Sequence, residues 1–482
     1  MDKKKFTKGI AYVGMGIVAM ALQKFLLIPI LTKNLGAEDY GAWTNIMNTV
    51  ILLAAVASIG MGPTIIRFLS AEKDKKEISR DFFLVFGITL LSSVILSIAC
   101  YFSSNSIALF ILKNMAYSHF IKIACALIII ETWNVIFIAL YKALKLFKTY
   151  TSVYIAYSII ELFLFWYLLS TGFKLMSIII ASIVIKILLV IAGLVATKFK
   201  VGWHRPNFKK TGHYLAYGLP LTLTPFYNWV IRVSDQYVIG FFYSAKEIGI
   251  YSLHYSLSYV LYNLTLVIIF VLSPTITELW EQKKIKEVKE CIKYSYKYLM
   301  MLLIPSVVGC FTLYESVIRN IATREFLTTG FLLLILGGAM IFSSIFALLQ
   351  NILLLLNKTA VINFITLALA LVNLVLNIIL IPRIGLFGAA ISTLITFISL
   401  AFLSLVYTYN EFKFDFMLTT IVKFVISAIV MSFMLSFFEK ISLFALLGQI
   451  AFGAVIYFSS LLMLKAVSIE EVKFFLRFYK KV

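Results

Sequence analysis

The sequence predicts an all-α integral membrane protein with about fourteen transmembrane helices. Three observations lead to this fold class: hydrophobic residues make up 62% of the 482 positions, charged residues make up only 13%, and apolar runs of about 20 residues recur along the chain. Helices follow because a backbone at membrane depth must satisfy its own hydrogen bonds. We expect two six-helix lobes, formed by parallel repeats around a central cavity, and two extra C-terminal helices.

Short connections separate the predicted spans. The spans lie at roughly 10–32, 43–66, 81–103, 119–141, 152–171, 175–197, 214–240, 250–275, 296–318, 327–356, 359–381, 386–408, 417–438 and 443–465. The first run is longer than the core of a signal peptide and lacks a small-residue cleavage site, so we expect it to remain as a helix.

Positive charge gathers in alternate connections, with about 30 Lys and Arg residues on the side of the amino terminus and about 10 on the other. The richest stretches are Arg67 to Arg80, Lys142 to Lys148, Lys198 to Lys210, Lys283 to Lys297 and the tail from Lys473 to Lys481. This asymmetry predicts a multi-pass protein of the cytoplasmic membrane with both termini in the cytoplasm. No compact basic domain carries the net charge of +21, so we expect membrane lipids as partners and no nucleic acid.

An internal repeat divides the chain. AEDYGAW (Ala37 to Trp43) aligns with AKEIGIY (Ala245 to Tyr251) at an offset of 208, GPTI (Gly62 to Ile65) with SPTI (Ser273 to Ile276) at 211, and Lys148-Thr149 with Lys358-Thr359 at 210. Three nearly equal offsets in the same order indicate duplication. Each copy holds six spans, an even number, so both enter the membrane in the same direction.

The repeat predicts three parts of the chain. Residues 1–210 form an N-lobe of spans 1–6, residues 211–412 form a C-lobe of spans 7–12, and residues 413–482 hold two extra spans and a basic cytoplasmic tail. Two parallel six-helix lobes that face each other enclose a cavity on the repeat axis.

Few ionisable residues lie at membrane depth, away from the ends of the spans, and each costs about 2.5–3.5 kcal/mol there, so each requires a reason. They are Lys24, Glu131, Glu161, Lys186, Arg232, Asp235 and Lys423. Lys423 lies near a cytoplasmic end, where its ammonium can reach the interface.

Lys24 and Arg232 are separated by 208 residues and therefore occupy equivalent positions in the two repeats. Two cations that face one cavity would bind an anion, and a phosphate is the natural ligand. The alternative is that Lys24 extends to an interface while Arg232 pairs with Asp235 one helical turn away.

The acidic residues in the spans have two possible roles. Asp235 either holds Arg232 in place or binds a proton or sodium ion, and Glu131 or Glu161 could take up a coupling proton. Lys186 either neutralises Glu161 or joins the cavity cations.

Polar amides in or near the spans are candidates for sugar contacts, although amides also join helices to one another. They are Asn228, Gln350, Asn373 and Asn377. Motifs of soluble enzymes are missing: the sequence has no phosphate-cradling Gly-rich loop, no His pair at metal spacing and no nucleophile elbow. We therefore expect no catalytic residue, no metal site and no cofactor other than a coupling ion, H⁺ or Na⁺.

Several segments resemble Wzx-type polysaccharide flippases of the multidrug, oligosaccharidyl-lipid and polysaccharide exporter superfamily. They are KGIAYVGMGIVAMALQKFLLIPILTKNLGAEDYGAW and SIGMGPTIIRFLS in the first half, and Tyr217 to Ser252 and Ile381 to Thr393 in the second. The resemblance covers essentially the whole chain, but its Gly, Pro and aromatic patterns identify a family, not a substrate.

The resemblance implies an ion-coupled, alternating-access transporter that moves an oligosaccharide linked through phosphate or pyrophosphate to a polyprenol. It implies cavity cations, which Lys24 and Arg232 match, and a cavity-mouth cation at Arg67, although Arg67 is equally explained as a topology charge. Related peptidoglycan-precursor flippases use several first-lobe arginines, whereas only Lys24 and Arg67 are present here. Glycosyltransferases or polymerases of the same pathway are the expected protein partners.

Three alternatives remain. A cation-coupled multidrug or small-molecule exporter of the same superfamily would have an acidic cavity without cations. A polytopic polysaccharide polymerase or ligase would place its catalytic residues on a large outside loop, but no outside connection exceeds about 15 residues here. The sequence does not exclude a scaffold for envelope or spore assembly.

Overall fold

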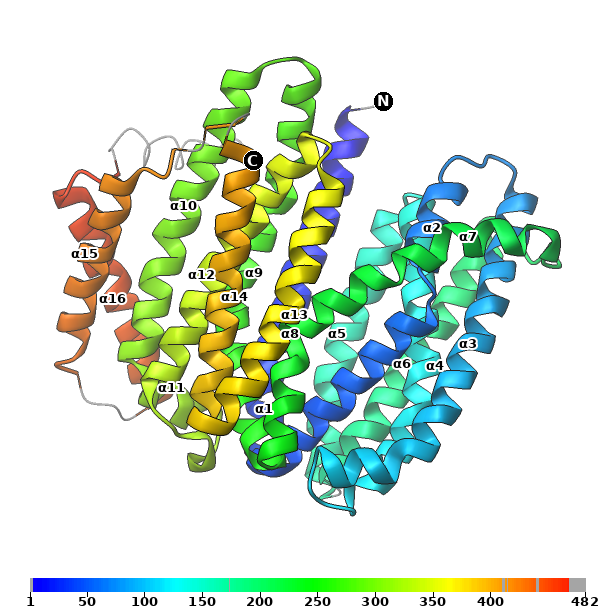
Figure 1. The fold of residues 1–482 in the computed structure, drawn as a ribbon, viewed down its shortest axis with the longest axis horizontal. Coiled ribbons are helices and arrows are strands. Elements are labelled where there is room, and N and C mark those ends of the chain that lie inside the picture. Colours follow the sequence, from blue (N-terminus) through cyan, green and yellow to red (C-terminus); the bar gives the residue numbers. More distant parts are fainter. Residues whose placement is uncertain (1–2, 173, 410–411, 414, 439–441, 468–482) are drawn as a thin grey trace. The chain divides into compact units, whose positions relative to one another are not determined.

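The computed structural model describes residues 3–172, 174–409, 412–413, 415–438 and 442–467, and their regular structure is helical (Figure 1). The elements are α1 (Lys3–Ala57), α2 (Met61–Leu69), α3 (Lys75–Phe110), α4 (Tyr117–Ala143), α5 (Phe147–Ser170), α6 (Lys174–Val201), η1 (Phe208–Lys210), α7 (Thr211–Leu221), α8 (Leu223–Phe242), α9 (Ala245–Glu281), α10 (Ile285–Thr312), α11 (Tyr314–Ile321), η2 (Arg324–Phe326), α12 (Gly330–Leu355), α13 (Thr359–Ile384), α14 (Leu386–Tyr409), α15 (Leu418–Leu435) and α16 (Leu443–Met463). The predicted basic tail from Lys473 to Lys481 lies outside the described residues.

The predicted fold class is confirmed. Within the described residues, 12 helices are long and apolar enough to cross a membrane. One of them, α1, holds two predicted spans separated by a kink at Gly36, whose φ of 74° and ψ of −179° suit glycine. The span predicted at 214–240 consists of α7 and α8 together, so the helices account for about fourteen spans.

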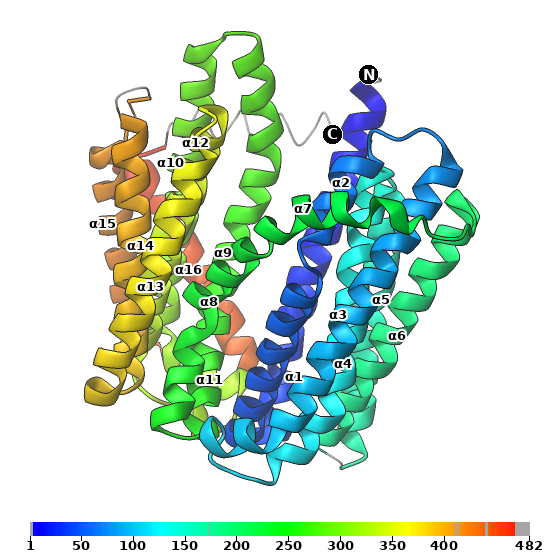
Figure 2. The same ribbon diagram turned by 45° about the vertical axis from the view of Figure 1, so that its right-hand side comes forward.

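Two predicted spans are interrupted where their helices meet. The span predicted at 43–66 breaks after Ala57 and resumes as α2, and a Cβ at Gly60 would lie only 2.0 Å from the carbonyl oxygen of Gly218 in α7. Glycine at both positions lets the two backbones touch. The helices α2 and α7 lie side by side in both ribbon views (Figure 2).

Several helices end in a left-handed residue that is a lysine. Lys145, Lys283 and Lys465 have φ values of 55°, 58° and 51°. In each case the next amide bonds back to a carbonyl in the last turn, as from Leu146 to Tyr141 at 2.8 Å. This C-terminal motif satisfies helix carbonyls and places a cation at the negative end of the helix dipole.

The helices group into two compact units, which we describe separately. The first unit comprises Met1–Ser252 and Ala370–Leu386, and the second comprises Leu253–Leu369 and Phe387–Val482. These units are groups of helices that pack on one another, whereas the predicted lobes follow the sequence repeat. The lobe boundaries at residues 210 and 412 therefore stay predictions.

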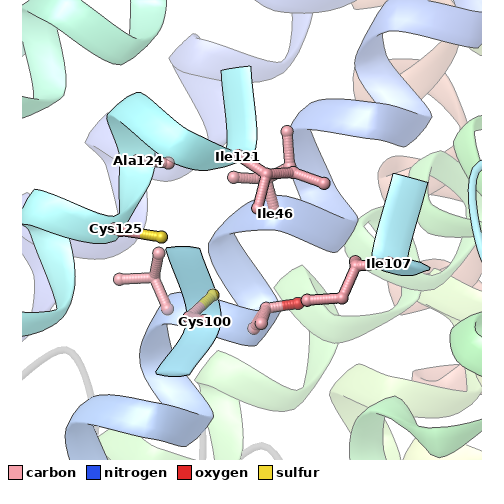
Figure 3. A pocket seen from close by; sticks show the side chains of 8 residues that line it. Ile46, Cys100, Ile107, Ile121, Ala124 and Cys125 are labelled. Carbon is pink, nitrogen blue, oxygen red and sulfur yellow. The ribbon is translucent and has the colours of Figure 1, made fainter. Parts of the chain in front are cut away.

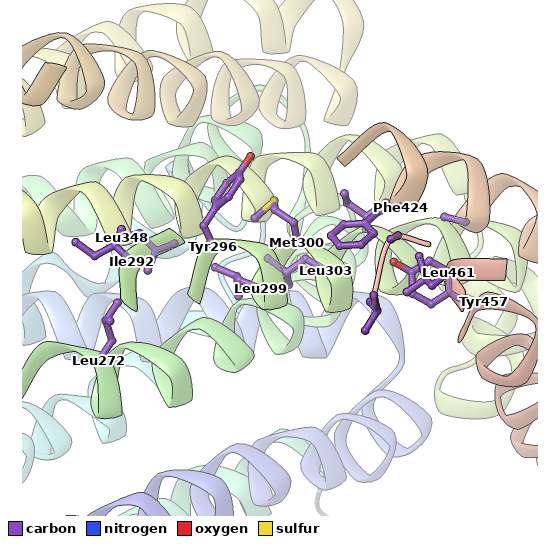
Figure 4. Close-up of a cluster of buried hydrophobic side chains, with 14 of the residues drawn as sticks. Leu272, Ile292, Tyr296, Leu299, Met300, Leu303, Leu348, Phe424, Tyr457 and Leu461 are labelled. Atoms are coloured by element: carbon purple, nitrogen blue, oxygen red, sulfur yellow. The ribbon is translucent and has the colours of Figure 1, made fainter. Parts of the chain in front are cut away.

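The core of the second unit is built around α10 (Figure 4). Tyr296, Leu299 and Leu303 of α10 are buried together with Phe424 of α15 and Tyr457 of α16. The two extra C-terminal helices thus contribute to this hydrophobic core. A cavity of about 300 Å³ lies among α10, α11, α15 and α16, with apolar walls.

Candidate functional site

The first unit contains two buried polar networks. The charge cluster consists of Gln23 and Lys24 of α1, Glu131 of α4, Tyr157 and Glu161 of α5, and Lys186 of α6. The amide cluster consists of Ser234, Asp235 and Gln236 of α8, Tyr251 and Ser252 of α9, and Asn373 and Asn377 of α13. Each network joins at least three helices.

Glu161 lies at the centre of the charge cluster, and its side chain is 7% exposed. Tyr157, one turn earlier on α5, donates its hydroxyl to Oε1 at 2.5 Å, and the amide of Gln23 donates to Oε2. Glu161 lies roughly nine residues before the C-terminal end of α5, or about 14 Å along the helix axis. The carboxylate is therefore held near the middle of the predicted membrane by two neutral donors.

Lys186 pairs with Glu131 in the charge cluster. Its Nζ lies 2.5 Å from Oε2 of Glu131, and the two side chains are only 12% and 22% exposed. The prediction was that Lys186 either neutralises Glu161 or joins the cavity cations; the structure instead places its direct ion pair on the other glutamate. Its charge still acts on Glu161 at longer range.

Lys24 is the exposed member of the charge cluster. It follows directly after Gln23, which is buried against Glu161, and its charge also acts on the Glu161 carboxylate. Lys24 is thus connected to the buried carboxylate on one side and accessible on the other. Arg232, its repeat equivalent, is half-buried on α8. The cavity predicted between the two lobes stays a prediction.

In the amide cluster, Asp235 is 1% exposed. Its Oδ2 accepts the Tyr251 hydroxyl at 2.5 Å, and its Oδ1 accepts the backbone amide of Gln236 at 2.8 Å. Asn377 donates to Asn373 at 3.1 Å, and Ser234 donates to the same Asn373 oxygen at 3.3 Å.

Of the predicted sugar contacts, Asn373 and Asn377 are fully buried. Both take part in joining α8 to α13, which was the alternative to sugar binding. Asn228 is exposed and donates to the carbonyl of Thr224 at 2.9 Å, while Gln350 is half-buried on α12. A role of these amides in sugar binding stays a prediction.

The two repeats contact each other through equivalent residues. A Cβ at Gly41 would lie 1.8 Å from the carbonyl oxygen of Ala245, and a Cβ at Gly249 would lie 1.9 Å from that of Ala37. Ala37 and Ala245 are 208 residues apart, as are Gly41 and Gly249. Thr44 and Ser252, also 208 apart, hydrogen-bond at 3.3 Å. The crossing of α1 and α9 therefore has approximate twofold symmetry, which supports the duplication found in the sequence.

Arg67 is exposed at the end of α2 and binds α7. Its guanidinium donates to the Tyr217 hydroxyl at 3.1 Å and lies 4.6 Å from the centre of the same ring. Such a stacked geometry suits arginine and leaves further donors on the guanidinium for an anion.

The connection before α7 is also fixed to the first unit. Nζ of Lys210 lies 3.0 Å from carboxylate oxygens of Glu77 and Asp81. Burial lowers the pKa of the Lys210 ammonium, but the hydrogen bonds and charges of Asp81 and Glu77 outweigh burial and raise that pKa overall. The ammonium thus stays charged at physiological pH.

Cys100 of α3 and Cys125 of α4 are free, buried thiols. Their side chains interact with each other and line a small hollow together with Ile46 (Figure 3).

Sequence reasoning missed Gln23 and Tyr157, although both are polar members of the charge cluster. Tyr157 is four residues before Glu161, a spacing that places the two side chains on one helix face. Gln23 is adjacent to Lys24 in an otherwise apolar run. Helical spacing alone could have predicted the contact of Tyr157 with Glu161. The contact of Gln23 with Glu161 joins α1 to α5 and could be seen only in the tertiary structure.

The fold and these networks define a multi-pass, all-helical membrane protein whose helices account for about fourteen spans. The chain belongs to the polysaccharide biosynthesis protein family, whose model matches residues 30–330. This match confirms, at the level of the family, the resemblance to polysaccharide flippases.

A curated relative has a related name. The Haloferax volcanii protein "Probable low-salt glycan biosynthesis flippase Agl15" is 24% identical over 281 residues. The match covers 55% of this chain and 59% of the relative, so it spans less than two thirds of that protein.

Solved structures share the fold over most of the chain. The structure titled "Lipid II flippase MurJ, inward closed conformation" has a TM-score of 0.75 at 17% identity, covering 94% of this chain and 98% of that one. An inward-facing multidrug resistance MATE family transporter of the MOP superfamily has a TM-score of 0.63 at 14% identity, covering 81% and 94%. At these identities the similarity establishes the fold.

Proposed function

We propose that this protein is a flippase that moves a polyprenyl-(pyro)phosphate-linked oligosaccharide from the cytoplasmic to the outer leaflet by alternating access. Membership of the polysaccharide biosynthesis family, the flippase name of the relative and the MurJ-like fold support this proposal. The product would supply cell-surface polysaccharide or glycan assembly. The charge asymmetry of the connections favours the cytoplasmic membrane, with both termini inside.

The observation that carries the proposal is the pair Lys24 and Arg232. These cations lie at equivalent repeat positions in membrane-spanning helices, and Lys24 is exposed. An accessible cation at membrane depth requires an anionic ligand, and the phosphate of a lipid carrier supplies one at that depth. Arg67 would meet the headgroup at the cytoplasmic entrance, and the lipid tail would stay in the bilayer.

The proposed protein is a transporter and not an enzyme, and its cycle is coupled to H⁺ or Na⁺. Asp235, Glu131 and Glu161 are the candidate ion sites because they are the carboxylates predicted away from the ends of the spans. Glycosyltransferases or polymerases that make and use the glycan would be its partners.

The test is a flipping assay in proteoliposomes with a defined polyprenyl-pyrophosphate oligosaccharide. Lys24→Ala and Arg232→Ala should each lower the flipping rate at least tenfold. Lys423→Ala is a matched control, since it removes a lysine from a membrane helix outside the repeat and should leave the rate within twofold. Unchanged rates in both cavity variants would contradict the proposal.

The MATE-like structures make a drug exporter the alternative, and the same vesicles test it. A flippase should not move lipophilic cations, because Lys24 and Arg232 repel them. Transport of such cations without flipping of the lipid-linked glycan would favour the alternative.

A further inference from the structure

The charge cluster contains two carboxylates and two cations, and these charges are not equivalent. Lys186 contacts Glu131 directly at 2.5 Å. Glu161 is contacted by the neutral donors Tyr157 and Gln23, while the charges of Lys186 and Lys24 act on it at longer range. The compensation of Glu161 therefore depends in part on Lys24.

Lys24 is also the cluster member that an anion can reach. Its side chain is exposed, whereas Gln23 and Glu161 are buried. A phosphate that binds Lys24 would cancel the charge that Lys24 supplies to Glu161. The carboxylate would then be buried without full compensation, which is costly unless it binds a proton.

We propose that Glu161 takes up one proton when the phosphate of the lipid-linked substrate binds Lys24. This inference rests on the proposed function and adds to it a carboxylate whose protonation is linked to substrate binding. The groups around Glu161 are Gln23 and Lys24 from α1, Tyr157 from α5 and Lys186 from α6, while Glu131 from α4 and Tyr154 from α5 act on Tyr157.

The geometry also indicates which oxygen receives the proton. Oε2 is bonded to the Nε2 amino group of Gln23, which can only donate. Oε1 is bonded to the Tyr157 hydroxyl, which can donate or accept. A proton from water would therefore bind Oε1, and the Tyr157 hydroxyl would turn to accept it. Tyr157 is a positioning residue in this scheme.

Linkage fixes the expected pH dependence. If substrate binding takes up a proton, then lowering the pH must strengthen substrate binding, by up to tenfold per pH unit. Above the pH at which Glu161 loses its proton even with substrate bound, the affinity becomes independent of pH.

The experiment is calorimetric titration of the full-length protein in lipid nanodiscs with farnesyl pyrophosphate. Repeating the titration in buffers of different protonation enthalpy gives the number of protons taken up. We expect about one proton for the wild type near neutral pH and none for Glu161→Gln, which should still bind the probe. Glu315→Gln, an exposed carboxylate paired with Arg319, should retain the uptake.

A second measurement needs no variant. Infrared difference spectra of the wild type should show a new protonated carboxylic acid band when the probe binds, and Tyr157→Phe should shift that band because its hydrogen-bond partner is lost. Binding without proton uptake and without this band would overturn the inference while leaving the proposed function intact. Failure of the wild type to bind the probe would overturn both.

Discussion

The charge cluster and the amide cluster are both buried in the first unit, but they satisfy their polar groups in different ways. The charge cluster balances carboxylates with lysines and extends to the exposed Lys24. In the amide cluster, Asp235 accepts hydrogen bonds from the Tyr251 hydroxyl of α9 and from the Gln236 backbone amide, while the neighbouring Ser234 bonds Asn373 of α13. The charge cluster reaches the surface at Lys24, whereas the hydrogen bonds of the amide cluster join α8 to α9 and α13.

The repeat makes this contrast informative. At an offset of 210, Glu131, Glu161 and Lys186 correspond to Ile341, Leu371 and Thr396. In the other direction, at an offset of 208, Asp235 corresponds to Leu27. The buried carboxylates of each copy therefore correspond to apolar residues in the other copy.

This divergence indicates that the halves have separate tasks. A duplicated scaffold needs similar apolar packing in both copies, but it does not need buried charge in either. We infer that the charged network of the first copy serves ligand and proton binding, and that the network around Asp235 fixes the contact of α8 with α9 and α13.

The largest expected effect comes from breaking the ion pair of the charge cluster. Lys186→Met leaves Glu131 buried without its partner and should destabilise the protein by about 3–5 kcal/mol. The double variant Glu131→Gln/Lys186→Met should recover most of this loss. Thermal unfolding in detergent, followed by tryptophan fluorescence, measures both.

The loss caused by Lys186→Met should also shrink as the pH is lowered, because a proton can replace the lysine charge on Glu131. A single variant as stable as the wild type would mean that the pair does not support the cluster.

The α1–α9 crossing, which brings Ser252 to α1, provides the next test. Gly249→Ala would put a methyl group 1.9 Å from the carbonyl oxygen of Ala37, so the backbones must separate. We expect a loss of about 1–3 kcal/mol from overpacking. Gly87→Ala is the matched control, since a Cβ there meets no atom within 4 Å. Equal stability of the two variants would contradict the close crossing.

Removing one hydroxyl tests the amide cluster. Tyr251→Phe deprives Oδ2 of Asp235 of a donor at 2.5 Å and should cost about 1–3 kcal/mol. Proton uptake with farnesyl pyrophosphate should not change, because this cluster is separate from Glu161. Tyr167→Phe, at an exposed tyrosine, should stay within about 0.5 kcal/mol of the wild type. Loss of proton uptake in Tyr251→Phe would mean that the networks are coupled.

The smallest effect is expected outside both clusters. Lys293 and Asp415 form an exposed pair at 2.6 Å, and Lys293→Met should cost less than about 1 kcal/mol. Hydrogen bonds from Lys293 and from the Met417 amide lower the pKa of Asp415 below its ordinary value of 3.8. Its stabilising effect is therefore present above that value and is lost as the pH falls through the lowered pKa.

Stability curves of wild type and Lys293→Met should accordingly differ slightly at pH 7 and converge in strong acid. A difference that grows with acidity would assign the effect to another group.

The number of helices could be predicted from the number and length of the apolar runs. The repeat could be predicted from the nearly constant offset between matching segments. The break at Gly60 was not, since it depends on the approach of Gly218 from 158 residues away. Likewise, the sequence marked Glu131, Glu161 and Lys186 as costly charges, but the choice of partner for Lys186 depends on how α4, α5 and α6 are rotated. Packing against neighbouring helices sets those rotations. A helix that is apolar on all sides has no polar face from which its rotation could be predicted.

The symmetric crossing of Gly41 and Gly249 has a consequence for the origin of the chain. Gly41 approaches Ala245, and its repeat equivalent Gly249 approaches Ala37, so the surface is self-complementary. In a half-length ancestor, before gene fusion, the same surface would have joined two identical subunits. The present chain would then retain that former dimer contact as an internal one.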